Sequence, residues 1–156
     1  ADDVIGTLAW QAAAAGYEVY MVTPDKDFGQ LVKENVYIYK PARMGNGIEI
    51  LGVPEILEKW EINHPQQVID ILGLWGDAVD NIPGIPGIGE KTAKKLIAEF
   101  GSVEKLVDSA EQLKGKQKEN VIAFREQALL SKRLATINTE VPVHFDEKGL
   151  TLDPPN

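Results

Sequence analysis

The sequence predicts an α/β fold, in which a small, partly parallel sheet flanked by helices is followed by an all-helical part. Two observations support this class. Helical and strand patterns alternate through the first 51 residues, and this order is typical of layered α/β domains with parallel strands. From Pro54 onward, apolar residues recur only at helical spacing. A chain of 156 residues is long enough to bury its own core.

The first part begins with a helix and then alternates between helix and strand. The predicted elements are a helix over 1–15, a buried strand over 17–23, a short helix over 28–32 and strands over 36–40 and 48–51. Alanines favour the first helix and Gly16 ends it. β-Branched and aromatic residues predict the strands. The turn Gly45-Asn46-Gly47 predicts a hairpin between the last two strands.

The second part is predicted to be helical. Pro54 and Pro65 stand where the first turn of a helix accepts proline. The predicted helices cover 54–61, 65–75, 90–100, 103–109 and 117–134. A glycine–proline turn over 83–89 separates the second of these helices from the third, and residues 141–145 predict an edge strand.

Composition excludes several classes of function. The chain contains no cysteine, which excludes disulfide scaffolds, thiolate metal sites and thiol catalysis. Its two histidines, His64 and His144, argue against a histidine-rich zinc site. No apolar run reaches membrane-span length and no signal peptide is visible, so we expect a cytoplasmic protein with no membrane partner. Because the first residue is Ala1 rather than methionine, we also expect a piece of a longer chain.

The net charge of −8 is unevenly distributed along the chain. Residues 1–83 carry 13 acidic and 5 basic side chains, whereas residues 84–133 carry 10 basic and 7 acidic ones. An acidic part followed by a locally basic part indicates two tasks in one chain.

Aspartates stand in pairs at the ends of three predicted elements. The pairs are Asp2 with Asp3, Asp25 with Asp27, and Asp77 with Asp80. Ligand sites in open α/β sheets lie beyond the carboxyl ends of the strands, where Asp25 and Asp27 are expected. Asp77 and Asp80 are neighbours if their turn is helical. Converging carboxylates require a cation, and oxygen ligands without Cys or His favour Mg²⁺ or Mn²⁺. Together the pairs predict a divalent-metal site.

Each pair alone also has a purely structural interpretation. Asp2 can be a helix N-cap, and Asp25 can cap the helix that follows Pro24. Asp80 and Asn81 can open a turn. The metal-site prediction therefore depends on all three pairs occurring in one acidic segment.

The most distinctive stretch is the glycine–proline turn that leads into the predicted helix 90–100. Its glycines let backbone N–H groups approach a ligand closely, and Gly89 opens a helix N-terminus suited to phosphate. Lys91, Lys94 and Lys95 follow, so this stretch can bind a phosphate backbone without reading sequence. The alternative is a loop between helices with solvated lysines. A nucleotide P-loop is excluded, because the G-x-x-x-x-G-K-[ST] spacing is absent.

Four segments resemble the 5′-nuclease domain of bacterial DNA polymerase I, which belongs to the flap-endonuclease-like 5′–3′ exonucleases. They read ADDVIGTLA, TPDKDFGQLV, ILGLWGDAVDNIPGIPGIGEKTAKKLI and LLSKRLATINTEVPV. The resemblance runs from Ala1 to about Val143. It implies part of a PIN-like nuclease core over 1–76, a helix–three-turn–helix DNA-binding element with trailing helices over 77–143, and a tail over 144–156.

The resemblance also implies roles for individual residues. Asp2, Asp25, Asp27 and Asp80 match catalytic, metal-ligating aspartates, with Asp2 shared between two ions. Asp3 and Asp77 match outer members of the same metal-binding cluster. The positions that match the DNA-holding hairpin, often with a monovalent cation, are Gly87, Ile88, Gly89, Lys91, Thr92 and Lys94.

The implied reaction is hydrolysis of DNA phosphodiester bonds at a 5′ end or flap, with up to two Mg²⁺ or Mn²⁺ ions. The implied partner is duplex DNA with a nick or 5′ flap. In the family, a glutamate directly precedes the A-D-D triplet and further ligands lie upstream, whereas this chain begins at Ala1. We therefore expect the N-terminal half of the nuclease domain and a polymerase domain elsewhere in a parent chain. This piece is expected to bind the ions weakly and to cleave DNA poorly.

Two other functions remain open from the residues. In a non-catalytic, sequence-independent duplex DNA-binding module, only the hairpin and the lysines would matter. In an Asp-x-Asp phosphatase, Asp25 would be a covalent nucleophile, and the glycine–proline turn would have no role.

Overall fold

A three-stranded mixed sheet lies at the centre of the N-terminal half of the computed structural model, which describes residues 1–41, 47–146 and 149. β1 (Val19–Val22) pairs in parallel with β2 (Val36–Pro41), and β2 pairs in antiparallel with β3 (Ile48–Leu51). The α/β class and the parallel first pair are thus confirmed. The sheet is mixed because β2 and β3 run in opposite directions. Two residues of the predicted turn between them, Gly45 and Asn46, lie outside the described residues.

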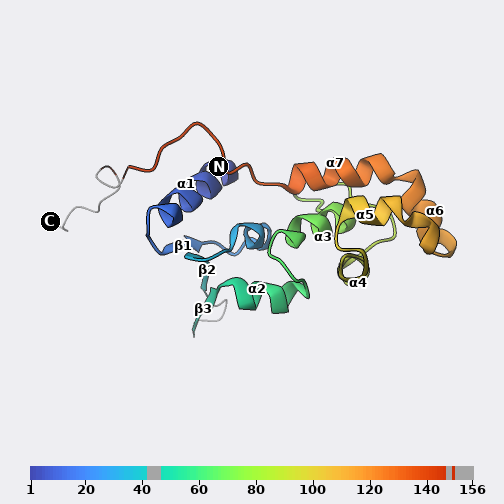
Figure 1. Cartoon of the computed structure of the whole chain (residues 1–156), viewed down its shortest axis with the longest axis horizontal. Helices are drawn as coiled ribbons and strands as arrows, with labels where there is room; N and C mark the ends of the chain where they lie inside the picture. Colours follow the sequence, from blue (N-terminus) through green and yellow to red (C-terminus); the bar gives the residue numbers. More distant parts are fainter. Residues whose placement is uncertain (42–46, 147–148, 150–156) are drawn as a thin grey trace.

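β1 is shorter and more exposed than the strand predicted over 17–23. Met21 is 5% exposed, whereas Tyr20 is 45% and Val22 69% exposed. β1 is the edge strand of the described sheet, so only β2 pairs with it. The helix α1 (Asp2–Ala14) packs beside it (Figure 1). The prediction of a buried strand is therefore wrong, because only one face of this edge strand is covered.

The chain leaves β1 and enters a short 3₁₀ helix, η1 (Lys26–Leu31), where the sequence predicts a helix over 28–32. The Asp25 carboxylate accepts a hydrogen bond of 2.9 Å from the backbone N–H of Asp27 and so caps η1. Leu31 is 1% exposed and anchors η1 in the core. The structural interpretation of Asp25 as a cap is therefore confirmed.

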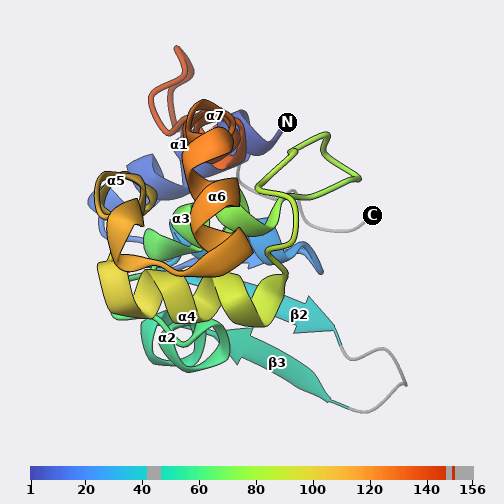
Figure 2. The same cartoon turned by 90° about the vertical axis from the view of Figure 1, so that its right-hand side faces the viewer.

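Helices form the remainder of the described fold. They are α2 (Val53–Trp60), α3 (Gln67–Trp75), α4 (Glu90–Phe100), α5 (Val103–Asp108), the 3₁₀ helix η2 (Ala110–Gln112), α6 (Gly115–Ala123) and α7 (Arg125–Ala135). In Figure 2, α4 lies alongside α2, with α6 and α7 on its other side. Among the described residues, no helix combines the length and apolarity needed to cross a bilayer.

Two predictions near the C-terminus are wrong. The single helix predicted over 117–134 is two helices, because Phe124 leaves helical geometry (φ −107°, ψ 24°) and packs its half-buried ring against the core. The strand predicted over 141–145 is an irregular segment instead. The side chain of Gln11 holds this segment to α1: its Nε2 donates to Val143 O at 2.8 Å, and its Oε1 accepts from Phe145 N at 2.7 Å.

α3 connects the sheet-bearing half to the helical half. It packs against η1 on one side and against α4 and α7 on the other. Its fully buried residues, all 0% exposed, are Val68, Ile71, Leu72 and Leu74. Because α3 is anchored from both sides, the loop that follows it lies beside η1.

Candidate metal centre and nucleic-acid interface

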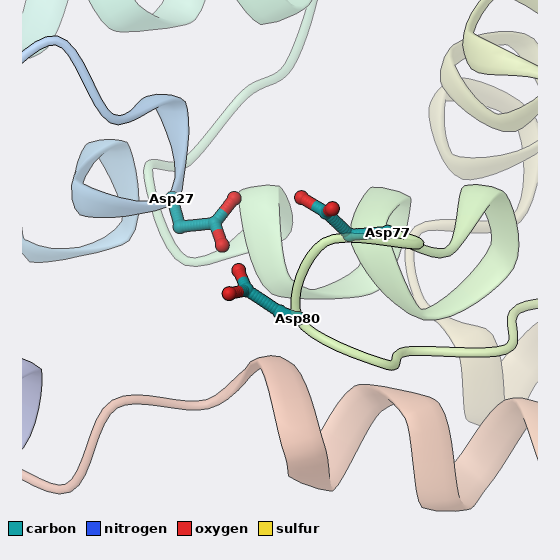
Figure 3. Close-up of side chains that lie close together, drawn as sticks. All are labelled: Asp27, Asp77 and Asp80. Atoms are coloured by element: carbon teal, nitrogen blue, oxygen red, sulfur yellow. The ribbon is translucent and has the colours of Figure 1, made fainter.

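Three carboxylates from two separate segments converge beside the C-terminal end of α3. Each of Asp27, Asp77 and Asp80 offers an oxygen, and these oxygens lie within 4.8 Å of one another. Figure 3 shows the three side chains pointing toward a common space. Asp27 comes from η1, whereas Asp77 and Asp80 come from the loop after α3. The structure thus brings together three of the six aspartates predicted as metal ligands.

The loop over residues 77–82 is closed by two reciprocal backbone hydrogen bonds. Asp77 N donates to Ile82 O and Ile82 N donates to Asp77 O, each at 2.8 Å. Asn81 adopts φ 57°, and Gly76 enters the loop at φ 79°, so the segment is a tight turn rather than a helix. Asp77 and Asp80 are therefore neighbours because of this closed turn, and not through the helical spacing that the sequence analysis considered for them.

Asp27 is a buried carboxyl with an incomplete set of partners. It is 6% exposed, and its Oδ1 has no hydrogen-bond partner among the described residues. Burial raises the pKa of Asp27 to about 7, with further contributions from the charge of Asp25 and a hydrogen bond with Asp80. A buried carboxylate of this kind is costly unless a positive charge compensates it. The site therefore fits a divalent cation with oxygen ligands.

Lys26 brings a positive charge into the same cluster. Its Nζ lies 2.6 Å from Asp77 Oδ2 and 3.7 Å from Asp27 Oδ1. The hydrogen bond from Lys26 lowers the pKa of Asp77, despite the opposing effect of desolvation. Lys26 is a site residue that was not predicted from the sequence. Its position between Asp25 and Asp27 was the available signal.

The other predicted ligands lie outside the group of three. Asp2 and Asp25 both line a cavity of about 560 Å³ between α1 and β1. Asp25 is close enough for its charge to raise the pKa of Asp27. The Oδ1 of Asp3 accepts a hydrogen bond of 2.9 Å from Asn138 N, so its carboxylate holds the segment after α7. The structure therefore gives Asp3 and Asp25 structural contacts, and does not bring Asp2 and Asp3 to the cluster.

The glycine–proline turn is held in place by side chains from α6 and α7. Gly84 N donates to Ser131 Oγ and Gln127 Nε2 donates to Gly84 O, both at 2.9 Å. Asn120 Nδ2 donates to Pro86 O at 3.1 Å. The turn has buried isoleucines, Ile85 at 2% and Ile88 at 6% exposure, and exposed glycines, Gly87 and Gly89. The backbone at these two glycines is thus exposed to solvent in a turn that side chains of α6 and α7 hold by hydrogen bonds.

Gly89 is the N-cap of α4 and supplies no capping side chain. The first N–H groups of α4 therefore lie at an exposed helix N-terminus, which favours an anion. Lys91 is exposed in the first turn of α4, and Thr92 is half-buried beside it. Gly87 and Gly89 are exposed as well, so these residues are open to solvent except for the half-buried Thr92, and phosphate binding here stays a prediction.

Lys94 lies apart from this surface. Its Nζ contacts Glu90 Oε1 at 3.1 Å, donates to Lys59 O at 3.2 Å and lies 5.9 Å from the centre of the Trp60 ring. Its side chain is only 14% exposed. The structure therefore uses Lys94 to join α4 to α2, which the sequence pattern alone does not show.

Comparison with known families covers both halves of the chain. Residues 1–61 match the model described as 5′-3′ exonuclease, N-terminal resolvase-like domain. Residues 63–156 match the 5′-3′ exonuclease, C-terminal SAM fold.

The chain is also similar to much longer curated proteins. It is 44% identical to DNA polymerase I of Bacillus subtilis over 151 residues, which is 96% of this chain and 17% of that protein. It is 41% identical to DNA polymerase I of Rhizobium leguminosarum over 157 residues, which is 100% of this chain and 15% of that protein. The chain thus spans about one sixth of the length of these relatives.

Two solved structures share the fold. Bacteriophage T5 5′-exonuclease with bound zinc ions superposes with a TM-score of 0.78 at 24% identity, over 88% of this chain and 50% of that one. A T5 D15 flap endonuclease variant, in a pseudo-enzyme–product complex with DNA and metal ions, gives 0.76 at 24% identity over the same shares. Family models that account for both halves of the sequence show that the chain belongs to the 5′-3′ exonuclease family.

Proposed function

We propose that this chain contributes the metal-binding and DNA-binding parts of a 5′–3′ exonuclease or flap endonuclease that hydrolyses DNA phosphodiester bonds. The observation that carries this proposal is the cluster of Asp27, Asp77 and Asp80, in which one buried carboxylate oxygen has no hydrogen-bond partner among the described residues. The family match and the DNA and metal ions in the T5 flap endonuclease complex support it.

In this proposal, Asp27, Asp77 and Asp80 hold a divalent ion, with Mg²⁺ or Mn²⁺ as the chemically suited choices. Asp2 and Asp25, at the neighbouring cavity, are candidates for a second ion. A divalent ion bound at such a site lowers the pKa of water and offsets charge on the phosphate. The role of the chain is to fix these carboxylates in one place, through the capped η1 and the closed 77–82 loop.

The hairpin positions the substrate. The exposed amides near Gly87 and Gly89 and the ammonium of Lys91 would bind phosphates of a duplex, which gives affinity without sequence specificity. The hairpin lies on the segment directly after the 77–82 loop, so DNA bound there would approach the carboxylates. Holding a phosphate near the ions is itself a large part of catalysis. Duplex DNA with a nick or 5′ flap is the proposed substrate.

Replacement of Lys91 by alanine is expected to weaken binding to unrelated duplexes equally and to reduce the salt slope of the affinity by about 1. The reason is the loss of one phosphate contact and of the counterion that this contact releases. Fluorescence anisotropy over a range of salt concentrations measures both quantities. The matched control is Lys94→Ala, which is expected to change the slope much less, because Lys94 is already paired with Glu90. A larger effect at Lys94 than at Lys91 would contradict this assignment.

Hydrolysis is tested with a 5′-flapped duplex and a small phosphomonoester side by side. Slow cleavage of the flapped duplex that requires Mn²⁺ and is lost in Asp80→Asn is the expected result. Release of phosphate from the monoester, lost in Asp25→Asn, would instead favour a phosphatase. If the flapped duplex stays intact at high protein concentration with Mn²⁺, this chain does not hydrolyse DNA, and DNA binding is its only proposed function.

A further inference from the structure

The side chain of Lys26 occupies the space where a cation would meet two of the three clustered aspartates. Its Nζ lies 2.6 Å from Asp77 Oδ2 and 3.7 Å from Asp27 Oδ1, and 5.4 Å from the centre of the Trp75 ring. The side chains of Asp77 and Asp27 are 10% and 8% exposed, whereas that of Lys26 is 39% exposed. The lysine therefore approaches two nearly buried carboxylates from the solvent side.

This ammonium satisfies Asp77 but not Asp27. At 2.6 Å the contact with Asp77 is a charge-assisted hydrogen bond, whereas 3.7 Å to Asp27 Oδ1 exceeds hydrogen-bond distance. Asp27 Oδ1 is accordingly left without a hydrogen-bond partner among the described residues. The cluster thus holds one positive charge and retains the capacity for more.

A divalent ion and the Lys26 ammonium cannot share this cluster without cost. A metal ion within reach of Asp27, Asp77 and Asp80 would lie only a few ångströms from Nζ in its present position. Like charges a few ångströms apart near a protein surface repel each other. The partly exposed lysine can avoid this repulsion, because its flexible side chain can move the ammonium into solvent.

We propose that Lys26 is a built-in counter-cation, which offsets part of the negative charge of the cluster without metal and must be displaced from Asp77 when a divalent ion binds. This inference rests on the metal site proposed above. It adds a competition between Lys26 and the ion, which lowers the affinity of that site for a divalent ion. It makes Lys26 a residue that sets metal affinity and keeps the carboxylates together beforehand. The competition is between the ammonium and the ion for Asp77 and requires no change in protonation.

The test compares Lys26→Met with Lys33→Met by isothermal titration with Mn²⁺. Lys33 is the matched control, because its Nζ lies 4.0 Å from the centre of the Trp10 ring and it has no salt bridge within the described part of the chain. We expect Lys26→Met to bind Mn²⁺ about tenfold more tightly than wild type, since a nearby like charge has been removed. Lys33→Met should keep the wild-type affinity. Without metal, Lys26→Met should melt at a lower temperature than Lys33→Met.

Tryptophan fluorescence provides a second measurement, which a purely structural role of Lys26 would not alter. Displacement of the ammonium from Trp75 by Mg²⁺ should change the emission of wild type and of Lys33→Met, and this change should be absent from Lys26→Met. Lys26→Arg keeps the charge and tests whether charge, rather than side-chain shape, limits the affinity. It should bind Mn²⁺ no more tightly than wild type.

The outcomes separate this inference from the proposed function. Equal Mn²⁺ affinity in wild type and Lys26→Met, or weaker binding by Lys26→Met, would overturn the competition while leaving the metal site intact. A folded wild type and a folded Lys26→Met that both fail to bind Mn²⁺ would overturn the metal site itself. Tighter binding by Lys26→Arg would show that the positive charge is not what opposes the ion.

Discussion

Replacement of Asp27 by asparagine is expected to stabilise the metal-free protein near neutral pH by about 2–4 kcal/mol relative to wild type. The pKa of Asp27 rises from 3.8 to about 7, chiefly through burial. Ionising this carboxyl in the folded chain therefore costs free energy that the unfolded chain does not pay. Asparagine has a similar shape and cannot ionise, so it removes this cost.

The sign of the pH dependence follows from the raised pKa. Between about pH 4 and pH 7, the folded chain keeps the proton of Asp27 and the unfolded chain has released it. The stabilising contribution of the protonated group is thus complete below pH 4 and is lost as pH rises to about 7. The advantage of Asp27→Asn over wild type should therefore be small at pH 4 and largest above pH 7.

Urea unfolding in EDTA at several pH values measures this difference. The matched control is Asp108→Asn. The side chain of Asp108 is 68% exposed, and its carboxylate pairs with Arg125. This control should leave stability within about 0.5 kcal/mol of wild type, as is usual at exposed positions. If the difference in free energy of unfolding between Asp27→Asn and wild type stays constant from pH 4 to pH 8, burial does not raise the pKa of Asp27 as described.

Gly84→Ala is expected to lower the free energy of unfolding by about 3 kcal/mol or more. A Cβ at this position would lie 2.6 Å from Gly76 N and 2.7 Å from Leu74 O, and both are backbone atoms that cannot move freely. Gly84 also adopts φ 64°, a conformation that alanine rarely occupies. This substitution would push the hairpin away from the end of α3. Thermal and urea unfolding measure the loss.

Gly89→Ala is the matched control for Gly84→Ala. Apart from Gly89 itself and its two chain neighbours, no heavy atom of the described residues lies within 4 Å of a Cβ built at Gly89, and its φ of −95° is ordinary for any residue. Stability should therefore change little. DNA affinity should nevertheless fall, because a methyl group would stand at the exposed backbone surface of the hairpin. Equal stability loss in both variants would contradict the different packing described for the two glycines.

The sequence predicted the bounds of individual helices and strands better than their burial and packing. Helix α4 begins and ends at the predicted residues, because apolar spacing and glycines at both ends mark it locally. The burial of β1 could not be predicted, since it depends on which strands lie beside it. The packing of Phe124 against the core constrains where the continuous helical pattern is interrupted. That constraint is absent from local spacing.

The candidate site was predicted in outline but not in its contacts. The carboxylate pairs indicated a cation, yet only their positions in space show that Asp27 meets Asp77 and Asp80, whereas Asp3 holds Asn138. The ion pair between Lys26 and Asp77 joins residues that are 51 positions apart. Local patterns carry no information on such a pair. A hydrogen bond over a long sequence separation becomes visible only once the elements are packed.

Thermal melts with and without Mn²⁺ measure whether Asp27, Asp77 and Asp80 hold a divalent ion. At an ion concentration about tenfold above Kd, binding should stabilise wild type by ~1.4 kcal/mol. For a domain of this size, the melting temperature should rise by roughly 3–6 °C. This rise should disappear in the double variant Asp27→Asn, Asp80→Asn. A rise of the same size in the double variant would show that the ion is bound elsewhere and not by these three aspartates.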